Sequence, residues 1–393
     1  MVDNQLSILG LGAMRITGSD AEKTVRYAID QGINFIDTAY IYQNGKNEEM
    51  LGRALMNGYR KKVFLATKLP LFLVKGPNDF DKFFNISRKR LKTNYIDYYL
   101  LHMLGDVKTL KKLFDFGLKE WFLAKKDIGE IRNIGFSFHG SKADFIELID
   151  YYRFDFCMVQ YNYLDEYNQA GIEGIRYAAD KNIPVLVMEP LRGGLLVKNL
   201  PSKVKDLFNE KFPEESYVSI ALRYPLSEPT VSLVLSGMRT ITEIDANLKT
   251  AENIKPLTDE EFSVYSKARE LLLTNIKVDC TGCGYCLPTC PKNIDIISCF
   301  NLYNEYFNFS KRKSKLQYMQ ITGLFGTKHS YASLCIQCKK CEPYCPQKII
   351  ISEQLMHVKR KMEKFAFKIV RFFVKFRINK KRKEKNNENQ NQA

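Results

Sequence analysis

Short, uninterrupted apolar runs alternate with longer amphipathic stretches from residue 6 to residue 251 of the chain. A run of about four to eight apolar residues is typical of a strand that is buried on both faces of a parallel sheet. Eight such runs predict eight strands, at residues 6–11, 33–37, 63–67, 96–101, 131–137, 155–161, 184–188 and 231–235.

The stretches between these runs place an apolar residue at every third or fourth position, which is the helical period. They predict helices from residue 48 onwards and at residues 78–92, 108–126, 173–180, 240–251 and 258–273. Eight strands that alternate with helices give the element count of a (β/α)8 TIM barrel, a fold of the α/β class. Residues 1–273 are therefore expected to form this barrel.

Three successive predicted strands each deliver a titratable side chain at the carboxyl end, and these ends share one face of a parallel barrel. Asp37 ends the first and is followed by Tyr42, Lys68 ends the second, and His102 ends the third. A tyrosine pKa of about 10 is high for an acid at neutral pH, and the Lys68 ammonium would lower it. Asp37 would keep Lys68 charged, while His102 would orient a carbonyl oxygen. Such a set would protonate a carbonyl as a nicotinamide delivers hydride.

These residues also carry a resemblance. The segments Asp37-Thr-Ala-x-x-Tyr42, Glu48-Glu-Met-Leu-Gly52, Ala66-Thr-Lys68 and Leu100-Leu-His102 resemble the aldo/keto reductase family. The resemblance extends from residue 9 to residue 253. It implies a (β/α)8 barrel, a nicotinamide cofactor, a small carbonyl or alcohol substrate and a catalytic tetrad formed by Asp37, Tyr42, Lys68 and His102.

The resemblance also implies a set of cofactor contacts. The matching positions are Ser137, Gln160, Met188, Gly237, Arg239 and Asn247. Glu243 stands where the family commonly has an arginine for the adenosine 2′-phosphate, although Thr240-x-x-Glu243 is also the sequence of a helix capping box. We expect NADP on the family resemblance, with NAD as the alternative.

Eight of the ten cysteines fall into two runs near the C-terminus. Cys280-x2-Cys283-x2-Cys286-x3-Cys290-Pro recurs as Cys335-x2-Cys338-x2-Cys341-x3-Cys345-Pro, which is the spacing of a bacterial ferredoxin. In two-cluster ferredoxins the fourth cysteine of each run ligates the other cluster. We therefore expect two [4Fe-4S] clusters. The predicted ligands are Cys280, Cys283, Cys286 and Cys345 for one, and Cys335, Cys338, Cys341 and Cys290 for the other.

Structural zinc is the alternative for the cysteine runs, although zinc sites need neither the third closely spaced cysteine nor the Cys-Pro ending. The residues between the runs predict one helix followed by a glycine-containing loop. The remaining cysteines, Cys157 and Cys299, are expected to be buried thiols.

Three further segments, 137–141, 160–165 and 188–194, resemble a branch of aldo/keto reductase-like proteins fused to a ferredoxin-type module.

The net charge of +16 is concentrated at the C-terminus. Residues 357–393 carry thirteen Lys or Arg and three Asp or Glu, a net +10 that leaves +6 for the preceding 356 residues. No nucleic-acid-binding motif appears, so nucleic acid is not an expected partner. A secretory signal and an apolar run of the ~18 residues that span a bilayer are both missing from the sequence, which favours a cytoplasmic location.

The C-terminal residues predict a basic amphipathic helix. Its basic stripe is Lys361, Lys364, Lys368, Arg371 and Lys375. Its apolar stripe is Met362, Phe365, Ile369, Phe372, Phe373 and Phe376. Such a helix suits peripheral contact with a membrane surface, and packing on the cysteine module or docking to a partner protein are the alternatives. The residues after 377 are expected to be disordered.

The sequence thus predicts a barrel at residues 1–273, a dicluster ferredoxin-type domain at 274–356, and a basic helix and tail at 357–393. The predicted function is an oxidoreductase whose barrel interconverts carbonyl and alcohol groups with a nicotinamide and is coupled to two [4Fe-4S] clusters. A redox partner protein is a further possible partner. The alternative is an iron–sulfur electron-transfer protein whose barrel is mainly a docking scaffold.

Overall fold

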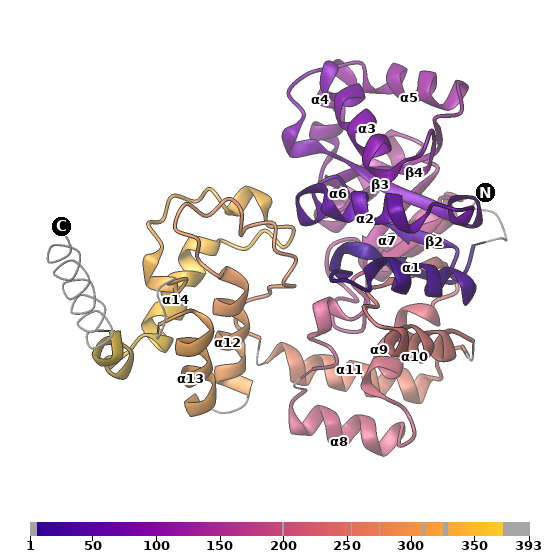
Figure 1. The fold of residues 1–393 in the computed structure, drawn as a ribbon. Coiled ribbons are helices and arrows are strands. Elements are labelled where there is room, and N and C mark those ends of the chain that lie inside the picture. The colour runs from indigo at the N-terminus through magenta and orange to yellow at the C-terminus, as the bar shows by residue number, and fades with distance from the viewer. Residues whose placement is uncertain are drawn as a thin grey trace, which may run out of the picture. The chain divides into compact units, whose positions relative to one another are not determined.

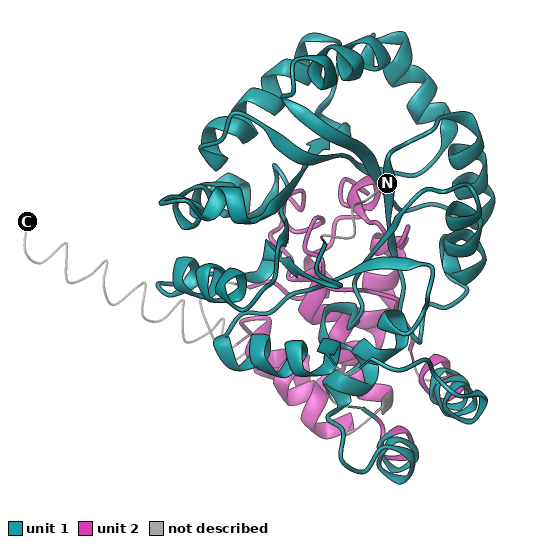
Figure 2. Cartoon of the chain, turned by 90° about the vertical axis from the view of Figure 1, so that its right-hand side faces the viewer, with its two compact units in different colours: residues 1–200, 205–269 teal, residues 201–204, 270–393 magenta. Residues whose placement is uncertain are grey.

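The fold was analysed in a computed structural model that describes residues 6–198, 200–252, 254–274, 276–308, 311–324 and 329–371. The chain divides into two compact units, which Figure 2 shows in different colours. The first unit contains residues 1–200 and 205–269, and the second contains residues 201–204 and 270–393. Each unit has its own core and is described separately below.

The first unit is a closed barrel of eight parallel strands in sequence order, surrounded by helices (Figures 1 and 2). The strands are β1 Leu9–Gly12, β2 Phe35–Asp37, β3 Phe64–Pro70, β4 Ile96–Leu104, β5 Ile131–Phe138, β6 Phe156–Gln160, β7 Val185–Met188 and β8 Val231–Ser236. Every neighbouring pair is parallel, including β1 with β8, which closes the barrel. The predicted (β/α)8 fold is confirmed.

Large apolar side chains fill the barrel interior. The ring of Tyr98 on β4 packs edge-on against Phe35 on β2, 5.0 Å between ring centroids, and against Phe156 on β6, 4.9 Å. Leu100, Leu186 and other buried residues complete this cluster. The interior is therefore a packed core, and functional groups must lie at the strand ends.

Helices follow the strands around the barrel. Their bounds are α1 Ala21–Asp30, α2 Lys46–Ala54, α3 Asn78–Leu91, α4 Val107–Asp115, α5 Leu118–Asp127, α6 Lys142–Tyr151, α7 Gly171–Asp180, α8 Ser202–Lys211, α9 Tyr217–Leu226, α10 Ile241–Glu252 and α11 Asp259–Leu273. The single helix predicted at residues 108–126 is wrong. Gly117 adopts a left-handed conformation with φ of 82°, which ends α4 and starts α5.

The second unit contains helices as well as the two cysteine runs (Figure 1). Its helices are α12 Ile296–Asn308, α13 Lys311–Ile321 and α14 Ile351–Met362. The prediction of one helix between the cysteine runs is therefore wrong, because two helices occupy this segment. Cys299 on α12 is fully buried, as is Cys157 in the barrel, and both are the buried thiols that the sequence predicts.

A bend divides the predicted C-terminal helix. α14 ends at Met362, and the buried Glu363 accepts hydrogen bonds from the Tyr318 hydroxyl, 2.7 Å, and the Ser333 backbone N–H, 3.0 Å. Phe367 is buried and packs against aromatic rings of the unit, whereas Phe365 is 77 % exposed. The predicted apolar stripe is thus interrupted. Phe367, which is not part of it, is buried, whereas Phe365, which is part of it, is exposed.

The outer part of that stripe, Phe372, Phe373 and Phe376, lies outside the described residues together with Lys375 and the tail. Membrane contact stays a prediction. Among the described residues, no helix combines the length and the apolar character that crossing a bilayer requires.

Candidate active site and cysteine pockets

Three neighbouring strands bring the four predicted catalytic side chains together. The Lys68 ammonium lies at the centre and donates to Asp37 Oδ1, 2.5 Å, to the Thr38 carbonyl oxygen, 2.7 Å, and to the Tyr42 hydroxyl, 3.4 Å. The ring of His102 stands nearly perpendicular to that of Tyr42, with 6.1 Å between the centroids. All four side chains are at least nine-tenths buried. A phenol hydroxyl, a carboxylate, a cation and an imidazole therefore meet at one end of the barrel.

The turn after β2 sets the position of Tyr42, the first residue of the short 3-10 helix η2 (Tyr42–Gly45). Gln43, Asn44 and Gly45 all have positive φ values, 52°, 55° and 89°, so the chain reverses sharply behind the tyrosine. The Gln43 side chain holds this turn by donating to two backbone oxygens of the loop after β1, at Met14, 2.9 Å, and Ile16, 3.0 Å.

Two buried side chains that the sequence analysis did not select also fix this turn. The Thr38 hydroxyl donates to Asn47 Oδ1, 2.7 Å, and the Asn47 amide donates to the Ala13 carbonyl, 2.8 Å. Thr38 lies inside the Asp-Thr-Ala motif, which is a usable signal, whereas nothing in the sequence marks Asn47. These bonds connect the loops after β1 and β2 beneath the tyrosine.

The Glu48–Gly52 motif anchors α2 against β3 and α3. The buried Glu48 accepts from the Thr67 hydroxyl, 2.7 Å, and from the Arg90 guanidinium, 3.1 Å. A Cβ placed at Gly52 would lie 2.2 Å from the Arg90 carbonyl oxygen, so only glycine permits this approach of α2 to α3. The motif therefore has a structural role. It binds Thr67, the residue directly before Lys68 on β3.

Burial shapes the electrostatics of the site. It lowers the pKa of His102 well below its usual value, and the nearby Lys68 charge adds to this shift. Burial also raises the pKa of Asp37 and lowers that of Lys68, while the attraction between the two opposes both shifts. His102 is consequently neutral at pH 7 and can donate a hydrogen bond without adding charge.

The predicted nicotinamide contacts lie on adjacent strands. Ser137 is the last but one residue of β5 and pairs with Met158 on β6. Gln160 and Met188 end β6 and β7 and pair with each other. The Ser137 hydroxyl accepts from the Met103 backbone N–H, 2.9 Å. These three residues lie on the same carboxyl-terminal face of the barrel as Lys68 and the three predicted catalytic residues around it.

A buried ion pair, which sequence reasoning missed, holds Gln160. The Gln160 side-chain amide donates to Asp165 Oδ2, 2.6 Å, and the same carboxylate oxygen accepts from Asn162, 2.9 Å. Arg192, from the loop after β7, approaches this oxygen to 3.1 Å, and both charged side chains are at least 95 % buried. Gln169 donates to the other end of the Gln160 amide, 3.2 Å. The orientation of Gln160 is therefore fixed by protein contacts.

The remaining predicted nucleotide contacts surround the start of α10. Asn247 is buried and donates to the Ser236 hydroxyl, 3.0 Å, while Gly237 follows β8. The Arg239 backbone N–H donates to Glu243 Oε2, 2.6 Å, and the Glu243 N–H donates to the Thr240 hydroxyl, 3.2 Å. Glu243 thus places its carboxylate at the helix N-terminus, where the helix dipole favours an anion.

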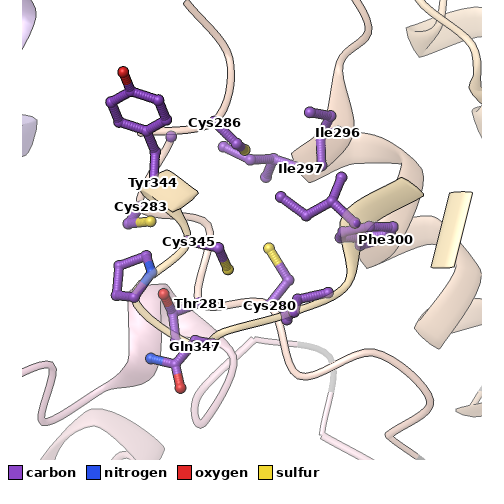
Figure 3. A pocket seen from close by; sticks show the side chains of 14 residues that line it. Cys280, Thr281, Cys283, Cys286, Ile296, Ile297, Phe300, Tyr344, Cys345 and Gln347 are labelled. Atoms are coloured by element: carbon purple, nitrogen blue, oxygen red, sulfur yellow. The ribbon is translucent and has the colours of Figure 1, made fainter. Parts of the chain in front are cut away.

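The eight cysteines of the second unit line two pockets. The first pocket is lined by Cys280, Cys283, Cys286 and Cys345, and Figure 3 shows these side chains arranged around one space. The second is lined by Cys335, Cys338, Cys341 and Cys290. This is the grouping that the crossed ligand assignment predicts. Ile296 lines both pockets, so the two pockets are adjacent.

The cysteine spacing suits a group larger than one metal ion. Among the described residues, no three Cys, His, Asp or Glu side chains are placed to hold a single metal ion. A structural zinc site instead brings its sulfurs to about 2.3 Å from one ion. Burial raises the pKa of Cys286 above its ordinary range and that of Cys341 to about 11, so these thiols release protons when they become ligands.

Comparisons with known proteins agree with both parts of the chain. The aldo/keto reductase family profile matches residues 8–270, and a 4Fe-4S dicluster domain profile matches residues 279–350.

Individual relatives match the barrel part. The uncharacterized oxidoreductase YqkF of Bacillus subtilis is 30 % identical over 295 residues, 66 % of this chain and 92 % of its own length. The aldo-keto reductase yakc of Schizosaccharomyces pombe, whose name includes NADP(+), is 29 % identical over 63 % of this chain and 72 % of its own. The holo form of aldo-keto reductase AKR11C1 from Bacillus halodurans superposes with a TM-score of 0.57 at 28 % identity, over 67 % of this chain and 92 % of its own.

Proposed function

Because the chain belongs to the aldo/keto reductase family and carries a 4Fe-4S dicluster domain, we propose that it reduces small carbonyl compounds, or oxidises the matching alcohols, with a nicotinamide dinucleotide. The observation that carries this proposal is the Lys68 ammonium, which contacts both Asp37 and the Tyr42 hydroxyl in a buried site. The alternative of a barrel that serves only as a scaffold is not favoured, because a scaffold needs no such buried charged group.

In the proposed reaction, a bound nicotinamide supplies hydride to the carbonyl carbon. Tyr42 gives its hydroxyl proton to the carbonyl oxygen, and Lys68 stabilises the resulting phenolate through its positive charge. Asp37 keeps Lys68 in place, at 2.5 Å. The neutral His102 donates a hydrogen bond to the same carbonyl oxygen and orients the substrate. Alcohol oxidation follows the same steps in reverse.

We propose NADP as the dinucleotide. The relative from Schizosaccharomyces pombe carries NADP(+) in its name, and Arg239 offers a guanidinium that is about half exposed beside the α10 N-terminus. Glu243 opposes a 2′-phosphate because its carboxylate occupies this N-terminus. The weak contact from Arg239 Nη2 to Glu243 Oε1, 3.5 Å, leaves the guanidinium able to turn towards a phosphate.

For the second unit we propose that each pocket holds one [4Fe-4S] cluster on four thiolates in the crossed grouping. Such clusters exchange single electrons. Cys280, Cys283 and Cys286 would hold three corners of one cluster, and Cys345 would hold the fourth. Cys290 would complete the second cluster in the same way.

Anaerobic purification tests this function. We expect about eight irons and as much sulfide per chain, together with dinucleotide-dependent reduction of small aldehydes that is faster with NADPH than with NADH. Two zincs without sulfide would overturn the cluster assignment. Full iron loading with no reduction of any aldehyde or ketone, by either dinucleotide, would overturn the reductase assignment.

Cys290→Ala tests the crossed grouping. This variant should damage the cluster built on Cys335, Cys338 and Cys341 and leave the other intact. Site-resolved Mössbauer or EPR spectra that show loss of the cluster on Cys280, Cys283 and Cys286 instead would contradict the crossed grouping.

A further inference from the structure

The two cysteine runs share one backbone conformation but not one set of residues. In both runs, the second and fourth residues after the first cysteine have positive φ. In the first run these residues are Gly282, φ 70°, and Gly284, φ 86°. In the second run they are Gln337, φ 57°, and Lys339, φ 58°. Glycine takes this conformation without the steric cost that a lysine carries, so the two runs have the same backbone with different side chains beside the cysteines.

The walls of the two pockets differ in charge. The described lining of the first pocket contains no Lys, Arg, Asp or Glu, whereas Lys292 and Lys339 both line the second. No acidic residue occurs in residues 287–294 or 329–341, the segments that carry these lysines. The nearby Glu342 is engaged inside the unit, where it accepts from the Ser352 backbone, 3.1 Å, and hydroxyl, 2.6 Å. Ser352 lines the second pocket, so the Glu342 carboxylate adds one negative charge there and, besides burial, helps to raise the pKa of Cys335 and Cys341. The two lysines of the lining exceed this one carboxylate, and the local charge stays positive.

The second pocket also lies at the surface. We define its rim as the exposed residues Pro291, Lys292, Ile336, Cys338, Lys339 and Lys340. Ile336 is 58 % exposed, while Cys338 is the one exposed cysteine among the described residues. An exposed ligand, an exposed aliphatic side chain and three lysines thus form one small surface.

We propose that this rim is the docking surface for an acidic one-electron carrier protein, and that electrons enter or leave the chain at the second pocket. The inference rests on the proposed function, because it requires a cluster in each pocket. Electron-carrier encounters bury little surface and depend on complementary charge for speed and orientation. One electron passes between carrier and cluster, and no bond forms or breaks.

Charge also makes the second pocket the better electron acceptor. Reduction adds one negative charge to a cluster, and cluster potentials depend on nearby charge and solvent exposure. Lys292 and Lys339 stabilise that charge at the second pocket, whereas the described lining of the first offers no cation. The cluster nearest the incoming carrier is therefore expected to have the higher reduction potential.

The test is stopped-flow reduction of the anaerobic holoprotein by a reduced acidic [2Fe-2S] ferredoxin, over a range of salt concentrations. Lys339→Gly suits the backbone conformation, so it removes the charge without straining the loop. We expect it to slow the second-order rate about two- to fivefold at low salt, and Lys292→Gln combined with it about tenfold. The difference should vanish at high salt.

Matched variants separate charge from loop effects. Gln337→Gly makes the same backbone change two residues away without loss of charge, and should leave the rate unchanged. Lys339→Arg keeps the positive charge and should be reduced by ferredoxin at the wild-type rate. A small viologen is a dication that needs no docking surface, so loss of a lysine should not slow its reduction of the protein at low salt. Potentiometric EPR should place the second-pocket cluster at a lower potential in Lys339→Gly, with the first unmoved.

An unchanged ferredoxin rate in the double variant at low salt would overturn the docking surface, as would faster reduction by a basic carrier protein than by the acidic one. These results are distinct from failure of the proposed function, which would appear earlier as missing iron and sulfide or as missing aldehyde reduction.

Discussion

The barrel site and the cysteine pockets achieve order in different ways. In the barrel, the Lys68 ammonium contacts both Asp37 and Tyr42 within 3.4 Å, and the closed sheet fixes the register of the strands that carry Lys68 and Asp37. The eight pocket cysteines lie on loops, and none of the ten cysteines, all within the described residues, forms a disulfide. The polypeptide alone thus defines the barrel site, whereas the pockets leave part of their geometry to the group that they hold.

Iron removal should separate the two regions most strongly. Ligation of a structural metal by thiolates contributes about 10 kcal/mol to folding, which is comparable to the whole stability of a domain. Anaerobic chelation should therefore expose residues 276–371 to proteolysis and leave the barrel resistant. Limited proteolysis followed by mass spectrometry provides the measurement. Equal resistance of both units without iron would show that the pockets are as self-sufficient as the barrel.

Tyr42→Phe should have the next largest effect, and only on the barrel. Loss of a general acid lowers turnover by roughly 10²–10⁴. Tyr40→Phe is a matched control two residues away, because the Tyr40 ring packs against Phe83 and needs no hydroxyl for that contact. Steady-state kinetics and iron content should be measured for both variants. Wild-type turnover in Tyr42→Phe would make the tetrad assignment wrong.

Asp165→Asn tests whether protein contacts alone orient the nicotinamide site. It removes the Asp165 charge from its buried ion pair with Arg192, which should lower the free energy of unfolding by about 3 kcal/mol. Glu173→Gln is the control, because its ion pair with Lys142 is exposed and worth less than about 1 kcal/mol. Urea denaturation of the barrel transition measures both. Equal losses would show that the buried pair contributes no more than a surface pair.

Acidification should affect the barrel through its buried histidines. Burial lowers the pKa of His139 to about 4. The unfolded chain therefore binds a proton more readily than the folded one, and stability is lost as pH falls below the unfolded value of about 6.5. Between pH 6.5 and 5 this residue removes about 2 kcal/mol.

Asp37 and Glu48 act in the opposite sense, since burial raises the pKa of both. The informative quantity is therefore a difference between proteins. His139→Asn keeps a donor for Gln169, which lies 3.1 Å from the ring Nδ1. Its barrel transition should depend less steeply on pH than that of the wild type. Identical slopes would exclude His139 as the source.

The same contrast explains what sequence could predict. The eight apolar runs predict the strands because a strand of a parallel barrel is buried on both faces and so consists of consecutive apolar residues. Cysteine spacing predicts the pocket grouping because thiolates must reach a common centre. The roles of Tyr42 and its neighbours stay predictions, although the structure places them together.

The sequence did not predict features that depend on a single backbone angle or on a partner far away in the chain. Gly117 breaks a helix whose hydrophobic pattern continues across it, and Glu363 bends another because its carboxylate is bound by Tyr318 and Ser333. The ion pair of Asp165 and Arg192 joins loops far apart in sequence, so no local pattern predicts it. Backbone angles at Lys339 became informative only beside those of Gly284.

The crossed grouping of the cysteines turns the segment from residue 291 to residue 334 into a loop with both ends fixed. The closure entropy of such a loop grows only with the logarithm of its length, about 0.6 kcal/mol for each doubling. Inserting α12 and α13 between the two cysteine runs therefore costs little, and their apolar faces add core in return. Chain length in this segment can change freely in evolution while the eight thiols keep their places.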